Sequence, residues 1–175
     1  EARYMDLFRR TAKKSGRRFF TAPRVHFELS GEQVIVQEFV AGMWLWELVA
    51  AVEQKNQRVL DLARQLEIDP VLIARRLAWI NYWAWHGNFF FRAEPHPDRI
   101  ILGAGGIVTF IDFGSVGAID TVKRRALQQN MYYASKQDPL NMARASLILL
   151  EPLPAVDPNV LTKELEACNW EMLFA

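Results

Sequence analysis

Apolar side chains recur at helical spacing near the start of the chain. Within residues 1–14, one face carries four of them, and basic residues occupy the opposite face. The four are Tyr4, Leu7, Phe8 and Ala12. This pattern predicts an amphipathic helix over residues 1–14. Helical spacing resumes from Met43 to Glu53 and continues after a break to about Leu66, so two more helices are expected there.

Three Asp-Pro pairs mark further helix starts. An aspartate side chain can cap free backbone N–H groups, and a proline at the first helical position has no N–H to leave unpaired. The pairs are Asp69-Pro70, Asp138-Pro139 and Asp157-Pro158. After Pro70, apolar residues at steps of four, three and four form a stripe that indicates a buried helix face. The stripe consists of Ile73, Leu77, Ile80 and Ala84.

Short runs of β-branched and aromatic residues predict two hairpins. Residues 25–29 and 34–39 are joined by a turn sequence, and residues 100–102 and 107–111 are joined by a glycine-rich segment. Glycines of this kind can form a phosphate-binding loop, but such a loop stands between a strand and a helix. Because these stand between two strands, a hairpin turn is expected. Together the patterns predict a helix-rich α+β fold.

The chain has 175 residues, enough for one domain with a substantial core and too few for two large ones. Its single cysteine, Cys168, excludes an internal disulfide framework and a cysteine-rich zinc site. The longest strongly apolar stretch, residues 77–85, is interrupted by Asn81 and is too short to cross a bilayer. No secretory signal opens the chain, so a cytoplasmic location is expected. Since the chain begins with Glu1 rather than Met, we expect it to be a fragment.

Positive charge is concentrated at the start of the chain. Residues 1–26 contain eight basic and two acidic residues, a net charge of +6, and the remainder carries −5. Charge runs are usually solvated helix ends, but a basic segment can also meet the head groups of anionic lipids at a membrane surface. Nucleic acid is not expected as a partner, because no motif that reads bases accompanies the charge. Protein partners are left open.

A loop and a tripeptide carry the chemistry of the chain. The segment Arg92-Ala93-Glu94-Pro95-His96-Pro97-Asp98-Arg99 follows a long helix and precedes the second hairpin, and Asp112-Phe113-Gly114 follows that hairpin directly. In kinases, a catalytic loop carries an aspartate base and, five positions later, an asparagine that binds metal. A hairpin and a metal-binding Asp-Phe-Gly come next. Glu94 and Arg99 stand at the two loop positions, five residues apart.

The amino-acid sequences of these segments resemble the motifs of the AarF/UbiB family of atypical kinases. The family's loop reads roughly His-Ala-Asp-Pro-His-Pro-Gly-Asn, residues 34–42 look like its hinge, and residues 111–117 match its Asp-Phe-Gly-Ser-Val-Gly turn. The resemblance implies a kinase-like fold, with a partial N-lobe and hinge in residues 1–40 and a helical C-lobe in residues 41–175. It also implies binding of ATP with Mg²⁺ and a role near membranes in quinone or lipid metabolism.

The resemblance assigns roles to individual residues. Glu38, Phe39 and Val40 would present backbone groups to an adenine ring, or else form an edge strand that enters a loop. Asp112 would hold the magnesium ion that bridges the nucleotide phosphates, since a hard cation prefers carboxylate oxygen; the alternative is a turn aspartate. Glu1 lies where the family's helix carries a glutamate that pairs with a strand lysine.

The chain departs from the family pattern inside the catalytic loop. Glu94 replaces the aspartate and moves the carboxylate out by one methylene. Arg99 replaces the asparagine and cannot ligate a cation, because a guanidinium has only donors. It can instead pair with Glu94 or Asp112, or contact phosphate oxygens. Residues 1–175 contain no glycine-rich nucleotide loop and no strand lysine of the kind that positions the phosphates.

Three functions stay open at this point. The first is an atypical kinase or ATPase of weak or absent activity, with Glu94 and Arg99 as catalytic-loop residues and Asp112 on metal. The second is a pseudokinase scaffold in which a buried ion network, Arg92, Glu94, Arg99 and Asp112, replaces the metal site. The third is a peripheral lipid- or quinone-binding module that uses the basic segment and the tryptophans, which would place the protein at a membrane. Whether the chain is an enzyme is therefore undecided.

Overall fold

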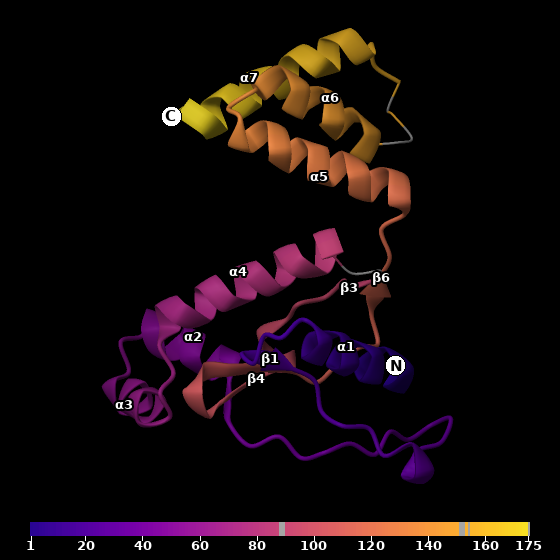
Figure 1. Cartoon of the computed structure of the whole chain (residues 1–175). Helices are drawn as coiled ribbons and strands as arrows, with labels where there is room; N and C mark the ends of the chain where they lie inside the picture. The colour runs from indigo at the N-terminus through magenta and orange to yellow at the C-terminus, as the bar shows by residue number, and fades with distance from the viewer. Residues whose placement is uncertain (88–89, 151–152, 154, 175) are drawn as a thin grey trace. The chain divides into compact units, whose positions relative to one another are not determined.

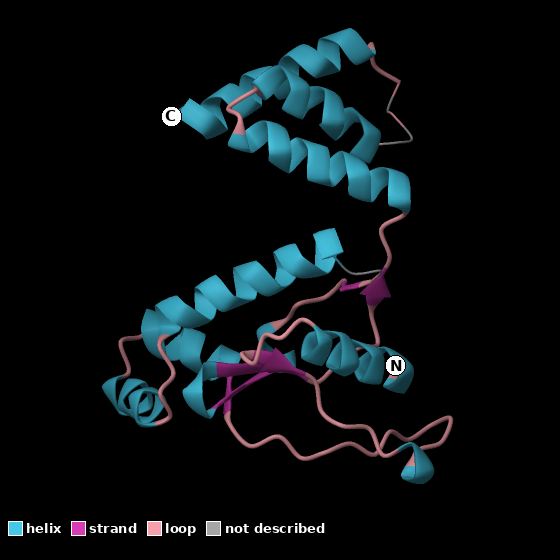
Figure 2. Cartoon of the chain, in the orientation of Figure 1, coloured by secondary structure: helices cyan, strands magenta, loops and turns pink. Residues whose placement is uncertain are grey.

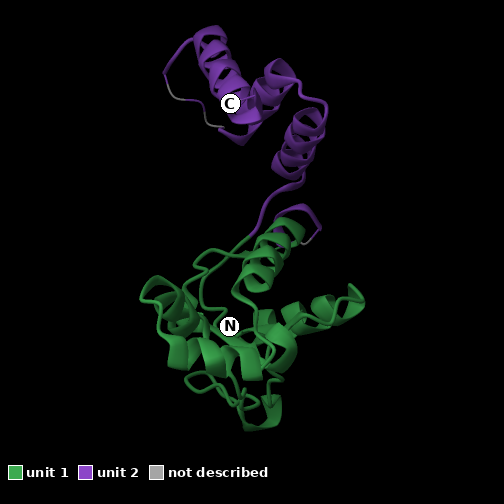
Figure 3. Ribbon diagram, turned by 90° about the vertical axis from the view of Figure 1, so that its left-hand side faces the viewer, with its two compact units in different colours: residues 1–83, 90–117 green, residues 84–89, 118–175 purple. Residues whose placement is uncertain are grey.

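The computed structural model describes residues 1–87, 90–150, 153 and 155–174 (Figure 1). Internal contacts divide the chain into two units, coloured separately in Figure 3. Unit 1 contains Glu1–Trp83 and Phe90–Gly117, and unit 2 contains Ala84–Phe89 and Ala118–Ala175. The boundary expected between an N-lobe and a C-lobe, at residues 40 and 41, falls inside unit 1. The division into two lobes stays a prediction.

Four helices begin in unit 1. They are α1 (Ala2–Lys14), α2 (Leu45–Glu53), α3 (Gln57–Gln65) and α4 (Pro70–Gly87). The helices predicted from spacing are confirmed, except that the second begins at Leu45 and Met43–Trp44 form strand β2. The buried face of α1 consists of Met5, Phe8 and Ala12, whereas Tyr4 and Leu7 are nearly half exposed. The buried face therefore lies slightly to one side of the one predicted.

A small mixed sheet supports unit 1 (Figure 2). Its strands are β1 (Phe20–Thr21), β5 (Ile107–Phe110), β4 (Ile100–Gly103) and β2 (Met43–Trp44), in that spatial order. β1 pairs parallel with β5, and the other pairs are antiparallel. The glycine-rich segment closes the β4–β5 hairpin as a 3₁₀ turn, η3 (Ala104–Gly106), in which Gly105 adopts a φ of 71°. The predicted second hairpin is confirmed.

The first predicted hairpin is wrong in its extent. Residues 25–39 form a single antiparallel bridge between Val25 and Gln37, and Phe27–Leu29 is a 3₁₀ turn, η1. Val34 and Phe39 are 61% and 89% exposed. A regular strand is stabilised by burying one of its faces, and this segment has too little core to pack against.

A second, two-stranded sheet frames the loop before β4. It pairs β3 (Phe91–Arg92) antiparallel with β6 (Val116–Gly117). A 3₁₀ turn, η2 (Pro97–Arg99), then leads directly into β4. The segments on either side of the β4–β5 hairpin are thereby tied together.

The core of unit 1 is centred on Phe8. Its ring lies 5.2–6.4 Å, centroid to centroid, from five other aromatic rings, mostly in edge-to-face or tilted geometry. These rings belong to Phe20, Trp83, Phe90, Phe110 and Phe113. Phe113 is only 1% exposed, so the Asp-Phe-Gly turn is anchored directly in this core.

Three helices begin in the described part of unit 2, α5 (Thr121–Ser135), α6 (Pro139–Leu149) and α7 (Pro158–Phe174). Asn130 on α5 donates hydrogen bonds from Nδ2 to the carbonyl oxygen of Met142 and to Oγ of Ser146, both 3.0 Å, which ties α5 to α6. The three Asp-Pro predictions are confirmed, since α4, α6 and α7 each begin at the proline. The chain is thus a helix-rich α+β protein. Within the part that the structure describes, no helix has the length and apolar character needed to cross a membrane.

Candidate functional site

Backbone hydrogen bonds bring the loop of residues 92–99 against the Asp-Phe-Gly turn. The N–H of Ala93 donates to the carbonyl oxygen of Ser115 at 3.0 Å. At the other end of the loop, the N–H of Ile111 donates to the carbonyl oxygen of Arg99 at 3.2 Å. The side chains that the sequence places in the loop and at Asp112 therefore share one site in unit 1.

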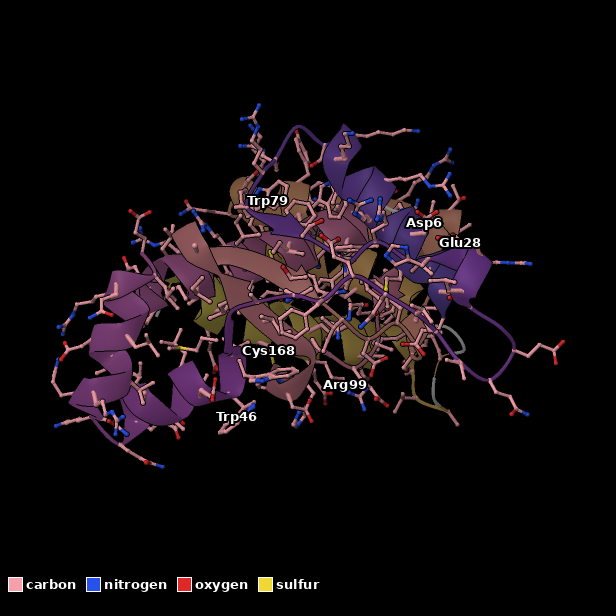
Figure 4. All side chains as sticks on the ribbon, turned by 90° about the horizontal axis from the view of Figure 1, so that it is seen from below. Asp6, Glu28, Trp46, Trp79, Arg99 and Cys168 are labelled. Carbon is pink, nitrogen blue, oxygen red and sulfur yellow. The ribbon has the colours of Figure 1, made fainter. Side chains whose placement is uncertain are left out.

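Arg99 occupies the centre of this site and is labelled in Figure 4. Its Nη1 donates to Oε2 of Glu94 at 2.9 Å, and its Nε lies 3.0 Å from Oδ2 of Asp112 in an ion pair. The structure thus brings together all three residues that the sequence placed at the catalytic loop and the metal position. The side chains of Arg99, Glu94 and Asp112 are 36%, 60% and 29% exposed. Solvent screens such pairs, so their effect on stability is small.

Asp112 also holds the turn that follows it. Its Oδ1 accepts a hydrogen bond of 2.8 Å from the N–H of Gly114. The N–H of Phe113, between them, donates at 3.1 Å to Oε1 of Glu1, from the residue that precedes α1. The resemblance placed Glu1 in the neighbourhood of a lysine but gave no sign of this contact. Glu1 therefore belongs to the site as a residue that fixes the turn.

Arg92 lies beneath this turn in a largely apolar setting. Its Nε donates to the backbone carbonyl oxygen of Asp112 at 2.9 Å, and its guanidinium lies 4.6 Å from the ring centre of Phe110 and 5.7 Å from that of Phe113. Burial lowers the pKa of Arg92 to about 10, with Asp112 opposing this shift and Arg99 adding to it. The predicted ion network is therefore corrected in two respects. Arg92 binds the backbone of Asp112 rather than its carboxylate, and the ion pairs are partly exposed rather than buried.

The other loop side chains lie in solvent. His96 is mostly exposed, and its Nδ1 lies 2.7 Å from Oδ1 of Asp98. Asp98 stands where the family's loop has glycine, and its Oδ1 is 3.9 Å from Nε of Arg99. Together with Glu94, these residues border an open hollow of about 400 Å³. The loop is thus braced by local pairing rather than by packing.

The residues present do not fit a resident magnesium ion. Asp112 uses Oδ1 for the N–H of Gly114 and Oδ2 for Arg99, while Glu94 is paired to the same guanidinium. Over the described ranges of the chain, no three His, Cys, Asp or Glu side chains gather in a group that could hold a metal. A cation at Asp112 would meet the positive charge of Arg99 and compete with it for the same carboxylate. The implied Mg²⁺ ligand role of Asp112 stays a prediction.

The predicted hinge borders a hollow of about 510 Å³. Glu38, Phe39 and Val40 line one side of it, and the apolar side chains of Ile101 and Ile111 line another. Ile111 directly precedes Asp112, so the hollow and the ion-paired site share a segment of chain. The sequence identified the hinge residues, but not Ile101 and Ile111, which it marked only as strand positions.

Hydrogen bonding at the hinge differs along the segment. Glu38 is anchored to Arg24, because its N–H donates to the Arg24 carbonyl oxygen at 2.8 Å and its Oε2 accepts from the Arg24 N–H at 3.1 Å. For the N–H of Val40, no acceptor is found among the described residues. The hinge is therefore anchored at Glu38, whereas the N–H of Val40, a residue that lines the hollow, remains available as a hydrogen-bond donor.

A helix-rich α+β fold that joins the predicted hinge, a loop in the position of the catalytic loop and an Asp-Phe-Gly turn in this order is consistent with a kinase-like domain. The ABC1 atypical kinase-like domain matches residues 1–146 of the chain. The chain belongs to this family, and the atypical kinase resemblance found in the sequence is confirmed.

Several proteins share modest sequence identity with the chain. Protein ACTIVITY OF BC1 COMPLEX KINASE 7, chloroplastic, of Arabidopsis thaliana is 26% identical over 153 residues, which cover 87% of this chain. Kinase 8 of the same series is 27% identical over 161 residues, or 90% of this chain. An uncharacterized protein of Synechocystis sp. is 27% identical over 135 residues, or 77% of this chain. The chain spans only 20%, 19% and 31% of the lengths of these three relatives.

Proposed function

We propose that this chain is a nucleotide-binding, kinase-like domain whose phosphoryl transfer is weak or absent. The observation that carries the proposal is the bridge that Arg99 forms between Glu94 and Asp112. It puts a fixed positive charge beside Asp112, the residue to which the resemblance gives the role of a metal ligand. ATP is the expected nucleotide, on the strength of the family and of the hinge hollow.

The hinge hollow supports binding of an adenine ring. An adenine base needs flat apolar walls and a few backbone hydrogen bonds. Ile101 and Ile111 supply apolar contact, and the N–H of Val40 supplies a donor. Because Ile111 leads into Asp112, a nucleotide seated in the hollow would direct its phosphates toward Arg99. A guanidinium binds phosphate oxygens well, since its N–H groups match them in geometry.

The same geometry argues against efficient transfer. Glu94 stands at the position of the base, but its carboxylate is paired to Arg99 and sits one methylene further out than an aspartate would. A displacement of about 1 Å can cost roughly a hundredfold in rate. Phosphoryl transfer depends almost wholly on positioning and electrostatics, so these changes act on its main source of catalysis. We therefore expect binding of ATP that does not require Mg²⁺.

A thermal-shift titration tests this function. ATP is added to the wild-type chain in EDTA and, separately, with excess Mg²⁺. We expect a saturable rise of Tm in EDTA, no larger rise with Mg²⁺, and phosphate release at the level of buffer alone. No rise under either condition would refute nucleotide binding. A Tm rise only with Mg²⁺ would refute the proposal that Arg99 takes the place of the metal ion. Sustained ATP hydrolysis would refute the proposal that phosphoryl transfer is weak or absent.

A Val40→Pro variant tests the seat of the base. Proline keeps an apolar side chain and removes the backbone donor of a residue that lines the hollow. The variant should weaken stabilisation by ATP and leave the response to pyrophosphate unchanged. Equal responses of variant and wild type to ATP would place the base elsewhere.

A second hollow favours a quinone- or lipid-binding module as the alternative function. Met43, Trp46, Val59 and Leu62 border about 580 Å³ between α2 and α3. Trp46 is 49% exposed, whereas Trp79 is partly buried and packs against the core of unit 1. A quinone analogue that quenches tryptophan fluorescence in the wild type, and less in Trp46→Leu, would support this alternative. The proposed peripheral membrane location rests on it and on the basic segment.

A further inference from the structure

A basic hollow lies where α1 ends and the chain turns into β1. It encloses about 640 Å³ and is bordered by five cationic side chains, with no acidic residue in its lining. They are Arg9, Arg10, Lys13, Arg17 and Arg18. We call this feature the basic hollow. Figure 4 shows nitrogen-tipped side chains projecting beside the labelled Trp79 and Asp6, away from the labelled Arg99.

Two of the five cations already have partners. Arg10 donates from Nε to Oδ2 of Asp6 at 2.7 Å, and this pairing raises the pKa of the Arg10 guanidinium. The guanidinium of Arg17 lies 5.3 Å from the ring centre of Trp79 on α4, which holds it over the aromatic face. Both side chains are thereby positioned at the edge of the hollow. The contact with the Trp79 ring leaves the positive charge of Arg17 without an acidic partner in the part of the chain that the structure describes.

The other three cations have no acidic partner among the described residues. Arg9, Lys13 and Arg18 form no ion pair there. Lys13 lies in the last turn of α1, where it complements the helix dipole, but Arg9 lies a full turn earlier and Arg18 lies beyond the helix. Arg9 and Lys13 are four residues apart on one helix face, where like charges destabilise each other. An anion between them would relieve that repulsion.

We propose that the basic hollow binds a ligand that carries phosphate groups. Arginine and lysine side chains around a concave surface raise the local concentration of anions and match phosphate oxygens as donors. Phe20, the aromatic residue in the lining, is 2% exposed, so no ring is free to stack on a nucleic-acid base. The ligand is therefore a phosphate-bearing head group of a membrane lipid or a soluble phosphate compound. This site is separate from the nucleotide site and does not depend on the proposed function.

The test compares two triple variants of equal charge. Arg9→Gln, Lys13→Gln and Arg18→Gln together empty the basic hollow of its unpaired cations. Arg3→Gln, Lys14→Gln and Arg24→Gln together remove three other cations of residues 1–26, which do not line it. The probes are pyrophosphate, measured by calorimetry, and vesicles of phosphatidylcholine with or without phosphatidylglycerol, measured by flotation. Melting curves of both variants check that each is folded.

The variant Arg9→Gln, Lys13→Gln and Arg18→Gln, called the hollow variant, should bind about tenfold more weakly, or worse, whichever probe the wild type binds. The affinity of the control variant for that probe should stay within about twofold of wild type. Binding of pyrophosphate alone identifies a soluble ligand, and binding of phosphatidylglycerol vesicles alone identifies a lipid head group. Added salt should weaken either interaction. Retained stabilisation of the hollow variant by ATP would show that the two sites are distinct.

Three outcomes would overturn the proposal. The first is no binding of either probe by the wild type. The second is an equal loss in both triple variants, which would mean that overall charge and not the hollow is responsible. The third is tighter binding of a single-stranded oligonucleotide than of pyrophosphate, lost in the hollow variant, which would assign the surface to nucleic acid.

Discussion

Arg99 and Asp112 form an ion pair in which Nε lies 3.0 Å from Oδ2, at the position where the resemblance places a metal ligand. The same guanidinium holds Glu94 through Nη1. One cationic side chain thus occupies both carboxylates on which the chemistry of a kinase-like site would depend. Because the three side chains are partly exposed, the arrangement contributes little to stability, and its consequence lies in what the site can bind.

Arg99→Asn should make the response to nucleotide depend on magnesium. The substitution frees Oδ2 of Asp112 and supplies an amide oxygen, so the site gains the donor set that Mg²⁺ prefers. In thermal-shift titrations with ATP, we expect a larger Tm rise in Mg²⁺ than in EDTA for this variant only. The free energy of unfolding without ligand should fall by about 1 kcal/mol or less.

Arg99→Leu provides the matched control for this change. It removes the charge without adding an oxygen, so its gain in magnesium response should be smaller than that of Arg99→Asn. If the Tm rise of Arg99→Asn with ATP gains no more from Mg²⁺ than that of wild type does, the guanidinium of Arg99 does not take the place of a metal ion.

Gly42→Ala should disturb the hinge by forcing it away from β4. A Cβ at Gly42 would overlap the carbonyl oxygen of Leu102 and lie 2.8 Å from Cγ2 of Ile101. Backbone on both sides must then shift, and such overpacking costs about 1–3 kcal/mol. Since Gly42 also borders the hinge hollow, stabilisation by ATP should weaken as well. Urea unfolding and the ATP titration measure the two effects.

Gly31→Ala is the control for that prediction. A Cβ at Gly31 meets no atom within 4 Å, so the free energy of unfolding should change by no more than about 0.5 kcal/mol. Comparable losses at Gly31 and Gly42 would show that the close approach to β4 is not the cause.

Phe8→Ala should destabilise unit 1 strongly. Phe8 is 3% exposed and touches five rings, so its removal leaves a cavity that neighbouring aromatic side chains fill poorly. We expect a loss of about 3–5 kcal/mol in the free energy of unfolding, measured in urea. Leu7→Ala, on the exposed side of α1, should cost no more than about 1 kcal/mol. A small effect at Phe8 would contradict the central place of its ring.

Local patterns were enough to predict most helices and the loop order of the site. The Asp-Pro pairs start α4, α6 and α7 because capping and the fixed φ of proline act within one turn. Glu94 and Arg99 are close in sequence, and a carboxylate and a guanidinium at that spacing readily meet. The order of loop, hairpin and Asp-Phe-Gly identified the family for the same reason.

Contacts between distant parts of the chain were not predictable from such patterns. The parallel pairing of β1 with β5 joins Phe20 to Val108, and neither short strand has a period long enough to signal it. The hydrogen bond from the Phe113 N–H to Glu1 spans almost the whole of unit 1. Arg92 was expected to pair with carboxylates, but the neighbouring rings of Phe110 and Phe113 hold it beneath the turn. These features depend on the assembled core.

Asp138 should give α6 a stability that is lost in acid. The side-chain amide and the backbone N–H of Asn141 donate to its carboxylate at 2.6 and 3.0 Å and lower the pKa of Asp138 below its ordinary value. Since the pKa is lower in the folded state, the stabilisation is complete above the ordinary pKa and disappears as the pH falls through the folded one. Asp138→Ala should therefore lower the Tm at neutral pH, and its gap to wild type should close in acid. Asp138→Asn is the control, because its side-chain oxygen still accepts hydrogen bonds but does not titrate, so this variant should lack the acid-dependent loss. If the Tm difference between Asp138→Ala and wild type stays constant with pH, the ionised cap is ruled out.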